Sequence, residues 1–295
     1  MNILLTGGTG FIGRALVSAL SDHQLTILTR DTGAAAELLG EQHHYLRSLD
    51  KLENLNGFDA VINLAGEPIV GKRWSDAQKK QLCHSRWDMT ALLTGLIQQS
   101  SEPPAVFISG SAIGYYGAQG SQPLTESSSP HSEFTHMLCE KWEQLALDAA
   151  SDTTRVCILR TGIVLGKHGG ALAKMLPPFK LGLGGPIGSG QQGMSWIHMA
   201  DMIGLIRFLL NNPKCSGIFN ATAPNPVSNR VFSQTLGEVL HRPALLPAPA
   251  FALHALLGEA AIMVLTGQYV LPQRAMEAGF GFRFPYLRQA LEDLL

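Results

Sequence analysis

A glycine-spaced run near the start of the chain, Thr6-Gly7-Gly8-Thr9-Gly10-Phe11-Ile12-Gly13, constrains its fold most strongly. An apolar segment, residues 2–6, precedes the run, and residues 11–20 follow with helical spacing. Between a strand and a helix, the first glycine permits a tight turn and the second lets the backbone approach a pyrophosphate. The third allows close helix–strand packing, and the free N–H groups of the helix face the phosphates. Gly7, Gly10 and Gly13 therefore predict a dinucleotide-binding site.

The second predicted strand, residues 25–29, ends at Thr29-Arg30. Sites that prefer NAD usually carry a carboxylate here for the ribose hydroxyls, whereas an arginine accommodates a 2′-phosphate. Arg30 can place its forked donors on such a phosphate. We therefore expect NADP(H) as the cofactor. Asp31 follows immediately and could point toward the same site, which leaves NAD(H) as the alternative.

Strand-like and helix-like segments alternate over the first two thirds of the chain. Predicted strands cover residues 2–6, 25–29, 60–64, 106–109 and 156–160, and predicted helices cover residues 11–20, 75–99 and 134–150. This alternation is typical of an α/β fold with a doubly wound parallel sheet. We expect a Rossmann domain over residues 1–165, rejoined by residues 195–220, and a smaller C-terminal substrate-binding lobe over residues 166–295.

Two segments of the C-terminal part have unusual compositions. Residues 180–193 contain six glycines, and we interpret them as a loop over a binding site. Residues 249–265 are the most apolar stretch, but they are too short and too interrupted for a membrane span. We predict a pair of buried helices there, although the stretch could instead form a homodimer interface.

Composition excludes several classes of protein. Lys and Arg number 22 against 23 Asp and Glu, so neither a nucleic-acid-binding surface nor a charged tail is indicated. The four cysteines lie far apart and predict neither a disulfide framework nor a metal site. The N-terminus carries no basic leader. We expect a cytoplasmic protein with a small-molecule substrate and without a membrane or nucleic-acid partner.

Several further motifs carry a resemblance to a known family. They are Asn63-Leu64-Ala65-Gly66, Ser109-Gly110-Ser111, Arg160-Thr161-Gly162 and Trp196-Ile197-His198-Met199-Ala200-Asp201. With the glycine run, they resemble the extended short-chain dehydrogenase/reductases. Arg73-Trp74, Ser85-Arg86, the run from Gly182 to Gly190 and Leu271-Pro272-Gln273-Arg274 resemble an atypical branch, the epimerase-family proteins. The resemblance covers essentially the whole chain.

The resemblance implies a nicotinamide cofactor and assigns its binding residues. These are Gly7, Thr9, Gly10, Phe11, Ile12 and Gly13 for the phosphates, Thr29 and Arg30 for the adenosine phosphate, Leu64, Ala65 and Gly66 beside the riboses, Arg86 as a second phosphate contact, and Ile163 and Val164 beside the nicotinamide. His198 matches a position that is usually structural in this superfamily.

The catalytic positions depart from the superfamily pattern. The superfamily pairs a Tyr with a Lys four residues later, across from a Ser that binds the reacting oxygen. Ser111 fits the serine, with Ser109 as the alternative, but Thr135 and Cys139 stand at the tyrosine and lysine positions. A threonine hydroxyl is a far weaker acid than a phenol. The candidates that could replace the missing acid are Tyr115, Tyr116, His136 and Lys141.

These observations leave two functions open. The first is an NADP(H)-dependent oxidoreductase or epimerase of a small polar, nucleotide-sugar-like substrate, with Ser111, Tyr116 and Tyr115 as catalytic residues. A nearby cation, either the oxidised nicotinamide ring or Lys141, is expected to lower the pKa of one of the tyrosines. The second is an NADP(H)-binding regulator or redox sensor without catalysis, which Thr135 and Cys139 favour.

Overall fold

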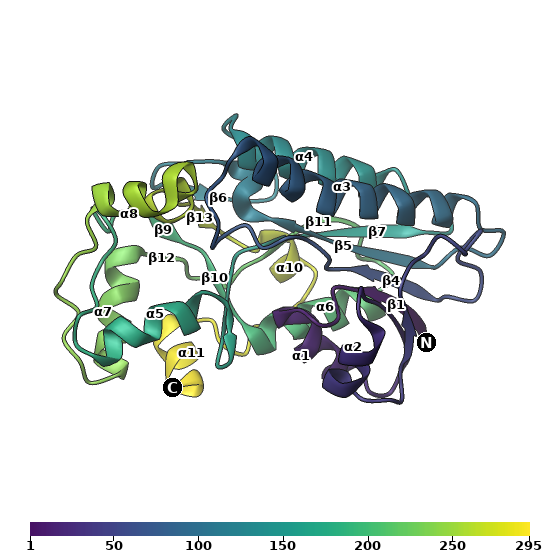
Figure 1. Ribbon diagram of the computed structural model, residues 1–295, viewed down its shortest axis with the longest axis horizontal. Helices are drawn as coiled ribbons and strands as arrows, with labels where there is room; N and C mark the ends of the chain where they lie inside the picture. Colours follow the sequence, from purple (N-terminus) through teal and green to yellow (C-terminus); the bar gives the residue numbers. More distant parts are fainter.

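The computed structural model describes residues 1–295 and is built on one seven-stranded sheet (Figure 1). The strands follow the order β11-β7-β5-β4-β1-β2-β3, and every neighbouring pair is parallel. They are β1 (Asn2–Thr6), β2 (Gln24–Leu28), β3 (His44–Leu46), β4 (Ala60–Asn63), β5 (Val106–Ala112), β7 (Arg155–Thr161) and β11 (Gly217–Ala221). The predicted doubly wound parallel sheet is confirmed.

Helices cover both faces of the sheet, as Figure 1 shows. One layer holds α1 (Phe11–Ala19), α2 (Thr32–Leu39) and α6 (Met199–Asn211), and the other holds α3 (Asp76–Gln98) and α4 (Phe134–Leu147). Strands such as β4 are buried along their whole length, as expected for a parallel sheet covered on both faces. The strand order reverses between the neighbours β1 and β4, because the chain returns from β3 at one edge to β4 on the other side of β1. Ligands of doubly wound sheets bind at the carboxyl ends of the strands at this point.

A smaller group of elements lies beyond the carboxyl ends of the strands, at the left of Figure 1. Its strand pairs are β8 (Ile163–Gly166) with β10 (Trp196–His198), β9 (Gly193–Met194) with β12 (Val227–Ser228), and β6 (Pro123–Leu124) with β13 (Tyr269–Val270). Its helices are α5 (Gly170–Lys180), α7 (Asn229–Val239), α8 (Ala250–Leu257), α9 (Ile262–Leu265) and α11 (Leu287–Leu294). The short helix α10 (Gln273–Glu277) lies near the centre of Figure 1, against β11. The Asp201 carboxylate on α6 accepts the backbone N–H groups of Arg283 and Phe284, at 2.7 and 2.9 Å. This contact ties the C-terminal segment to the helix layer of the sheet.

The prediction of buried helices over residues 249–265 is wrong. No residue of α8 is buried, and Phe251 and Leu256 are 77% and 69% exposed. Arg73 donates to the carbonyls of Ala255 and Leu256, capping the C-terminal end of α8. The residues that follow α8, among them Ala260 and Ile262, pack against a cluster around Trp74. The apolar composition of α8 therefore does not reflect burial. No helix of the protein has the length and apolar character needed to cross a bilayer.

Candidate functional site

The glycines after β1 serve two different purposes. Gly7 has φ +72°, and a Cβ there would lie 2.6 Å from the Leu64 carbonyl oxygen. A Cβ on Gly13 would lie 2.1 Å from the Gly7 carbonyl oxygen. The fold itself therefore requires glycine at both positions. A Cβ on the exposed Gly10 would meet only the Gly7 oxygen, at 3.1 Å, so the protein leaves open space there.

That open space lies at the start of α1. Gly10 is the N-cap residue, and no side chain caps the helix. The first-turn N–H groups therefore have no side-chain acceptor, and the positive end of the helix dipole favours an anion. Thr9 is exposed beside this end, and Phe11 and Ile12 form its first turn.

The turn between β8 and α5 encloses the Phe11 ring. A Cβ on Gly166, Gly169 or Gly170 would lie within 2.8, 2.6 or 2.7 Å of a ring atom. Only glycine therefore fits at these three positions while the ring keeps its place. Val164 lies just before this turn, on the buried part of β8, so the predicted nicotinamide neighbour and the phosphate loop are close in the fold.

A buried hydrogen-bond network positions the segment after β4. Thr6 Oγ1 donates to Asn63 Oδ1 at 2.6 Å, and Asn63 Nδ2 donates to Thr90 Oγ1 on α3 at 2.9 Å. The Ala65 N–H in turn donates to Thr6 Oγ1 at 3.2 Å. These bonds hold Leu64, Ala65 and Gly66 beside the phosphate loop, where the resemblance places the cofactor riboses.

Arg30 is a free cation at the end of β2. It is exposed and forms no hydrogen bond or ion pair within the protein. Asp31 is committed elsewhere, because its Oδ1 caps α2 by accepting the Ala34 N–H at 3.0 Å. Lys72 and, more weakly, Arg30 lower the pKa of Glu67, so Arg30 is near the segment that follows Gly66. The arrangement fits a dinucleotide with a further phosphate beside Arg30.

Arg86 lies beside Gly66, and its guanidinium carbon would be 3.1 Å from a Cβ at that glycine. Its terminal nitrogens donate to the carbonyls of Leu82 and Glu67, at 3.0 and 2.9 Å. The side chain is nearly buried and its cation faces the Trp142 ring. A phosphate contact by Arg86 stays a prediction, since these nitrogens already have acceptors.

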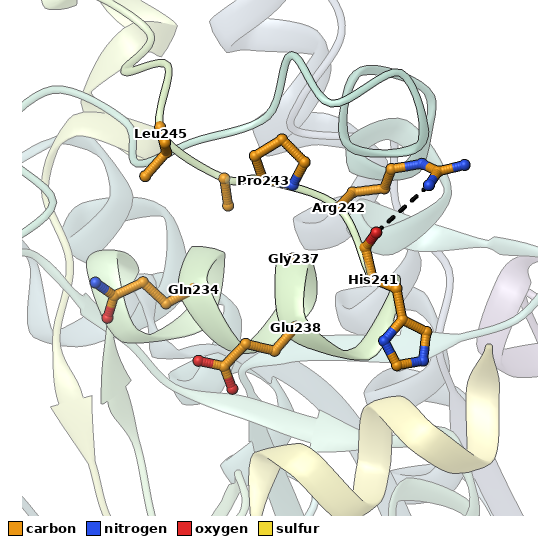
Figure 2. A pocket seen from close by; sticks show the side chains of 8 residues that line it. Gln234, Gly237, Glu238, His241, Arg242, Pro243 and Leu245 are labelled. Atoms are coloured by element: carbon orange, nitrogen blue, oxygen red, sulfur yellow. Dashed lines mark hydrogen bonds between the residues drawn. The ribbon is translucent and has the colours of Figure 1, made fainter.

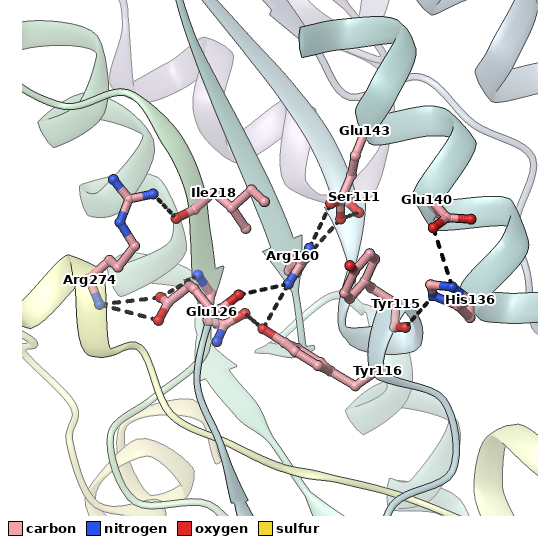
Figure 3. A network of polar contacts seen from close by, with 11 residues as sticks. Ser111, Tyr115, Tyr116, Glu126, His136, Glu140, Glu143, Arg160, Ile218 and Arg274 are labelled. Atoms are coloured by element: carbon pink, nitrogen blue, oxygen red, sulfur yellow. Dashed lines mark hydrogen bonds and ion pairs between the residues drawn. The ribbon is translucent and has the colours of Figure 1, made fainter. Parts of the chain in front are cut away.

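Ser111 belongs to a buried ionic network between β5, α4 and β7 (Figure 3). Its Oγ donates to Glu143 Oε1 at 2.6 Å. Arg160 holds the same carboxylate with two hydrogen bonds, Nε to Oε1 at 2.9 Å and Nη2 to Oε2 at 2.8 Å. The hydroxyl proton of Ser111 is therefore already engaged in a hydrogen bond within the protein.

Tyr116 is held at the far side of the same network, as Figure 3 shows. It is fully buried, its hydroxyl donates to Asn220 Oδ1 at 2.7 Å, and it accepts from Arg160 Nη1 at 3.1 Å. Burial raises the pKa of Tyr116 to about 12 although the Arg160 charge opposes the shift. The expectation that a nearby cation lowers the tyrosine pKa is therefore wrong for Tyr116, because desolvation of the phenolate outweighs the cation.

Tyr115 differs from its neighbour in exposure and in bonding. It is half-buried, and its hydroxyl forms no hydrogen bond within the protein. The Arg160 guanidinium carbon lies 3.3 Å from the centre of its ring, and the His136 ring meets it edge-on at 5.1 Å. Tyr115 and Tyr116 follow β5 in η1 (Ile113–Tyr116), a single 3₁₀ turn, and their rings meet edge-on with centroids 5.5 Å apart.

The helix positions of the missing acid–base pair face inward. Thr135 and Cys139 are buried on the side of α4 that packs against the end of β5, and Thr135 Oγ1 donates to Glu133 at 2.6 Å. Burial raises the pKa of the Cys139 thiol to about 12. His136 is bound to the Tyr115 carbonyl oxygen at 2.9 Å, and exposed Lys141 lies over the Trp87 ring. None of these four side chains supplies a free acid on the Ser111 side.

The raised pKa of Tyr116 predicts a loss of stability in alkali. A folded-state pKa of about 12, against about 10 in the unfolded chain, favours the neutral phenol in the fold. The stabilisation is complete below pH of about 10 and is lost as pH rises toward about 12, amounting to at most roughly 3 kcal/mol. A near-ultraviolet titration of tyrosinate should show one of the five tyrosines ionising last, together with unfolding. Loss of the late-ionising tyrosine in Tyr116→Phe identifies it, and ionisation together with the other tyrosines would contradict the burial argument.

Sequence reasoning missed Glu143 and Arg160 as site residues. Arg160 ends an apolar strand run, and Glu143 lies eight residues beyond Thr135, on the same helix face. A charge at the end of a buried strand requires a partner, and helical spacing points to Glu143. His198 was predicted to be structural, which is confirmed: its Nδ1 accepts the Ala200 N–H at 3.0 Å and caps α6.

A depression elsewhere on the surface does not belong to this site. A depression of about 460 Å³ lies at the C-terminal end of α7, with Glu238, His241 and Arg242 around it (Figure 2). It is far from the phosphate loop in Figure 1, and Arg242 donates there to the neighbouring His241 carbonyl. No group of three or more His, Cys, Asp or Glu side chains is placed to hold a metal ion.

Comparison with known proteins agrees with the geometry of the phosphate loop. The NAD dependent epimerase/dehydratase family matches residues 3–221, and a domain of unknown function (DUF1731) matches residues 248–294. The Arabidopsis thaliana "Epimerase family protein SDR39U1 homolog, chloroplastic" is 44% identical over the whole chain and 87% of its own length. Bacillus subtilis "Epimerase family protein YfhF" is 37% identical over the whole chain and 98% of its own length.

Comparison with solved structures indicates the same family. Human epimerase family protein SDR39U1, crystallised with NADPH, superposes with a TM-score of 0.92 at 37% identity, covering 100% of this chain and 99% of that one. UDP-glucuronic acid 4-epimerase from Bacillus cereus shares the fold, with a TM-score of 0.78 at 18% identity over 100% of this chain and 95% of that one. The resemblance inferred from the motifs is confirmed. The chain belongs to the NAD dependent epimerase/dehydratase family and is of the SDR39U1 type.

Proposed function

We propose that the protein is an NADP(H)-dependent oxidoreductase or epimerase that acts on a small polar, nucleotide-sugar-like substrate. The observation that carries the proposal is the unpaired Arg30 at the end of β2, together with the open space at Gly10. The NADPH in the crystal structure of the human relative supports it. When bound, the cofactor donates or accepts a hydride at its nicotinamide ring.

The protein's own residues would bind and orient this cofactor. The N-terminus of α1 and the backbone around Gly10 would hold the diphosphate. Arg30 would bind the 2′-phosphate, and Leu64 to Gly66 would lie along the riboses. Val164 would pack against the nicotinamide from β8.

Arg30→Ala should weaken NADPH binding by roughly 10- to 100-fold, because a hydrogen bond to a charged group contributes about 1.5–3 kcal/mol. NADH lacks the 2′-phosphate, so its affinity should change little and serves as the internal control. Fluorescence titration of both nucleotides against both proteins measures the two ratios. Equal affinity of the wild type for NADPH and NADH would refute the role of Arg30.

We assign Tyr115 as the proton donor of the reaction. Among Ser111, Tyr115 and Tyr116, it alone carries a hydroxyl without a partner in the protein. Arg160 would position it, because the guanidinium lies against its ring and is itself fixed by Glu143. Ser111 would act from the same network, accepting or relaying a hydrogen bond at the reacting oxygen.

Tyr115→Phe should lower single-turnover NADPH oxidation by roughly 10²-fold or more, the usual contribution of a general acid. Tyr116→Phe should have a smaller effect on turnover and a larger one on stability, since its hydroxyl is bonded to Asn220 and Arg160. A panel of carbonyl compounds and nucleotide sugars supplies the substrates. Full activity of Tyr115→Phe on a substrate that the wild type reduces would remove this assignment.

A second function, an NADP(H)-binding regulator, is favoured by the engaged hydroxyls of Ser111 and Tyr116. The high pKa of Cys139 argues against a thiolate redox sensor, because the thiolate is the form that oxidants attack. Tight NADPH binding without turnover of any compound in the panel would support the regulator.

A further inference from the structure

A groove of about 720 Å³ adjoins the site described above, sharing Phe11 and Gly166 with it, on the face that carries α1 and α6. Its walls are α1, the turn after β8, the first half of α6 and the end of α11, along the lower side of Figure 1. The volume is in the range of small-molecule sites.

Unpaired positive charge gathers in this groove. Arg14, Lys167 and Arg207 line it, are exposed, and form no side-chain hydrogen bond or ion pair within the protein. Asp293 is the single carboxylate among the lining residues. Since the whole chain has a formal net charge of -1, this concentration of cations is local. Cations on a concave surface raise the local potential and attract anions.

A buried donor without a good acceptor faces the same groove. His198 is 4% exposed, and its Nδ1 accepts the Ala200 N–H, so in the neutral ring Nε2 carries the proton. Nε2 forms no hydrogen bond of good geometry, and its nearest acceptor is Asp293 Oδ2, which lies at 3.4 Å, an ion-pair distance longer than the usual N–H···O bond. An unsatisfied buried donor is costly, and a ligand oxygen in the groove would satisfy it.

The start of α6 adds to this potential. His198 is the N-cap of a 13-residue helix whose positive end lies at the groove. The carboxylate of Asp293, near the chain end, shows that a negatively charged oxygen fits at this place. An arginine guanidinium can donate two parallel hydrogen bonds to two oxygens of one phosphate, and a lysine ammonium adds a point charge.

We propose that this groove binds a small anion that carries a phosphate or diphosphate group. Arg14 and Arg207 would hold the phosphate from the two facing helices, with Lys167 at the rim. The Nε2–H of His198 would donate to a phosphate oxygen. The site is separate from the space at Gly10, because the groove is lined by the Phe11, Arg14 and Ala15 side of α1 and not by Gly10.

Inorganic pyrophosphate is the probe, titrated calorimetrically into the full chain with NADPH in excess so that the cofactor phosphate site is filled. We expect a dissociation constant on the order of 100 µM or tighter. Arg14→Ala/Arg207→Ala should weaken binding by roughly 10-fold or more. The matched control is Lys80→Ala/Lys214→Ala, which removes the same charge from exposed positions outside the groove and should leave binding unchanged.

Backbone-amide NMR locates the bound pyrophosphate. Shifts at residues 14–15, 166–168, 198–207 and the end of α11, without shifts at residues 7–10, support the proposal. Three results would overturn it: no binding by the wild type, equal weakening in the groove and control variants, or shifts confined to the phosphate loop. The last result also reports on NADPH, because it occurs only if the cofactor leaves that loop open.

Discussion

Gly10→Val should abolish NADPH binding, with a loss of at least roughly 100-fold, while the protein stays folded. A Cβ at Gly10 meets only one backbone oxygen, at 3.1 Å, so the fold tolerates a side chain there better than at Gly7 or Gly13. The added methyl groups would occupy the space in front of α1 that the diphosphate requires. Fluorescence titration measures binding, and thermal unfolding measures the fold.

Two further glycines serve as controls for this variant. Gly13→Val should unfold the protein, because its Cβ would lie 2.1 Å from the Gly7 carbonyl oxygen. Gly95→Ala, on α3 with nothing within 4 Å of its Cβ, should change neither property. NADPH protection that persists in Gly10→Val would contradict the assignment of the phosphate loop.

Arg160→Met should lower the free energy of unfolding by about 3–5 kcal/mol, because it leaves the buried Glu143 carboxylate without its ionic partner. The side chains of Arg160 and Glu143 are 1% and 5% exposed, and their closest nitrogen–oxygen distance is 2.8 Å. The double variant Glu143→Gln/Arg160→Met should recover part of this loss, since no unpaired charge remains. Urea unfolding measures all three proteins.

The matched control is an exposed ion pair with nearly the same nitrogen–oxygen distance. Lys72 lies 2.7 Å from Glu67, and its side chain is 65% exposed. Lys72→Met should therefore cost no more than about 1 kcal/mol. Equal losses in Arg160→Met and Lys72→Met would show that burial does not govern the energy of the Arg160–Glu143 pair.

Five strands of the sheet, β1, β2, β4, β5 and β7, could be predicted from the sequence because each is a short apolar run bounded by a turn signal. The edge strands β3 and β11 were not predicted, since β3 has only three residues and begins with a histidine, and β11 contains a glycine and an asparagine. The observed boundaries differ from the predicted ones where polar residues continue a strand or a helix. β5, predicted to end at residue 109, extends through Ser111 to Ala112. The helical pattern predicts a start of α6 at residue 202, but α6 begins at Met199, directly after its His198 cap. Neither extension changes the hydrophobic pattern on which the prediction rests.

The cofactor side of the site was easier to predict than the catalytic side. Gly7, Gly10 and Gly13 act through the backbone within one turn, so local sequence determines them. Tyr115 and Tyr116 are adjacent and chemically identical, and only the 3₁₀ turn and the packing of β11 decide which hydroxyl is bonded. The exposure of α8 depends likewise on what packs against it, which its composition does not encode.

The glycine turn around Phe11 limits how this chain can be divided or recombined. The phosphate loop belongs to the first strand and helix, yet the turn that encloses its aromatic residue is contributed by residues 166–170. A relative with a larger residue at 166, 169 or 170 would clash with Phe11 in a chimaera joined between these segments. Exchanges of the C-terminal part among homologues should therefore keep residues 166–170 with the N-terminal half, or change Phe11 at the same time.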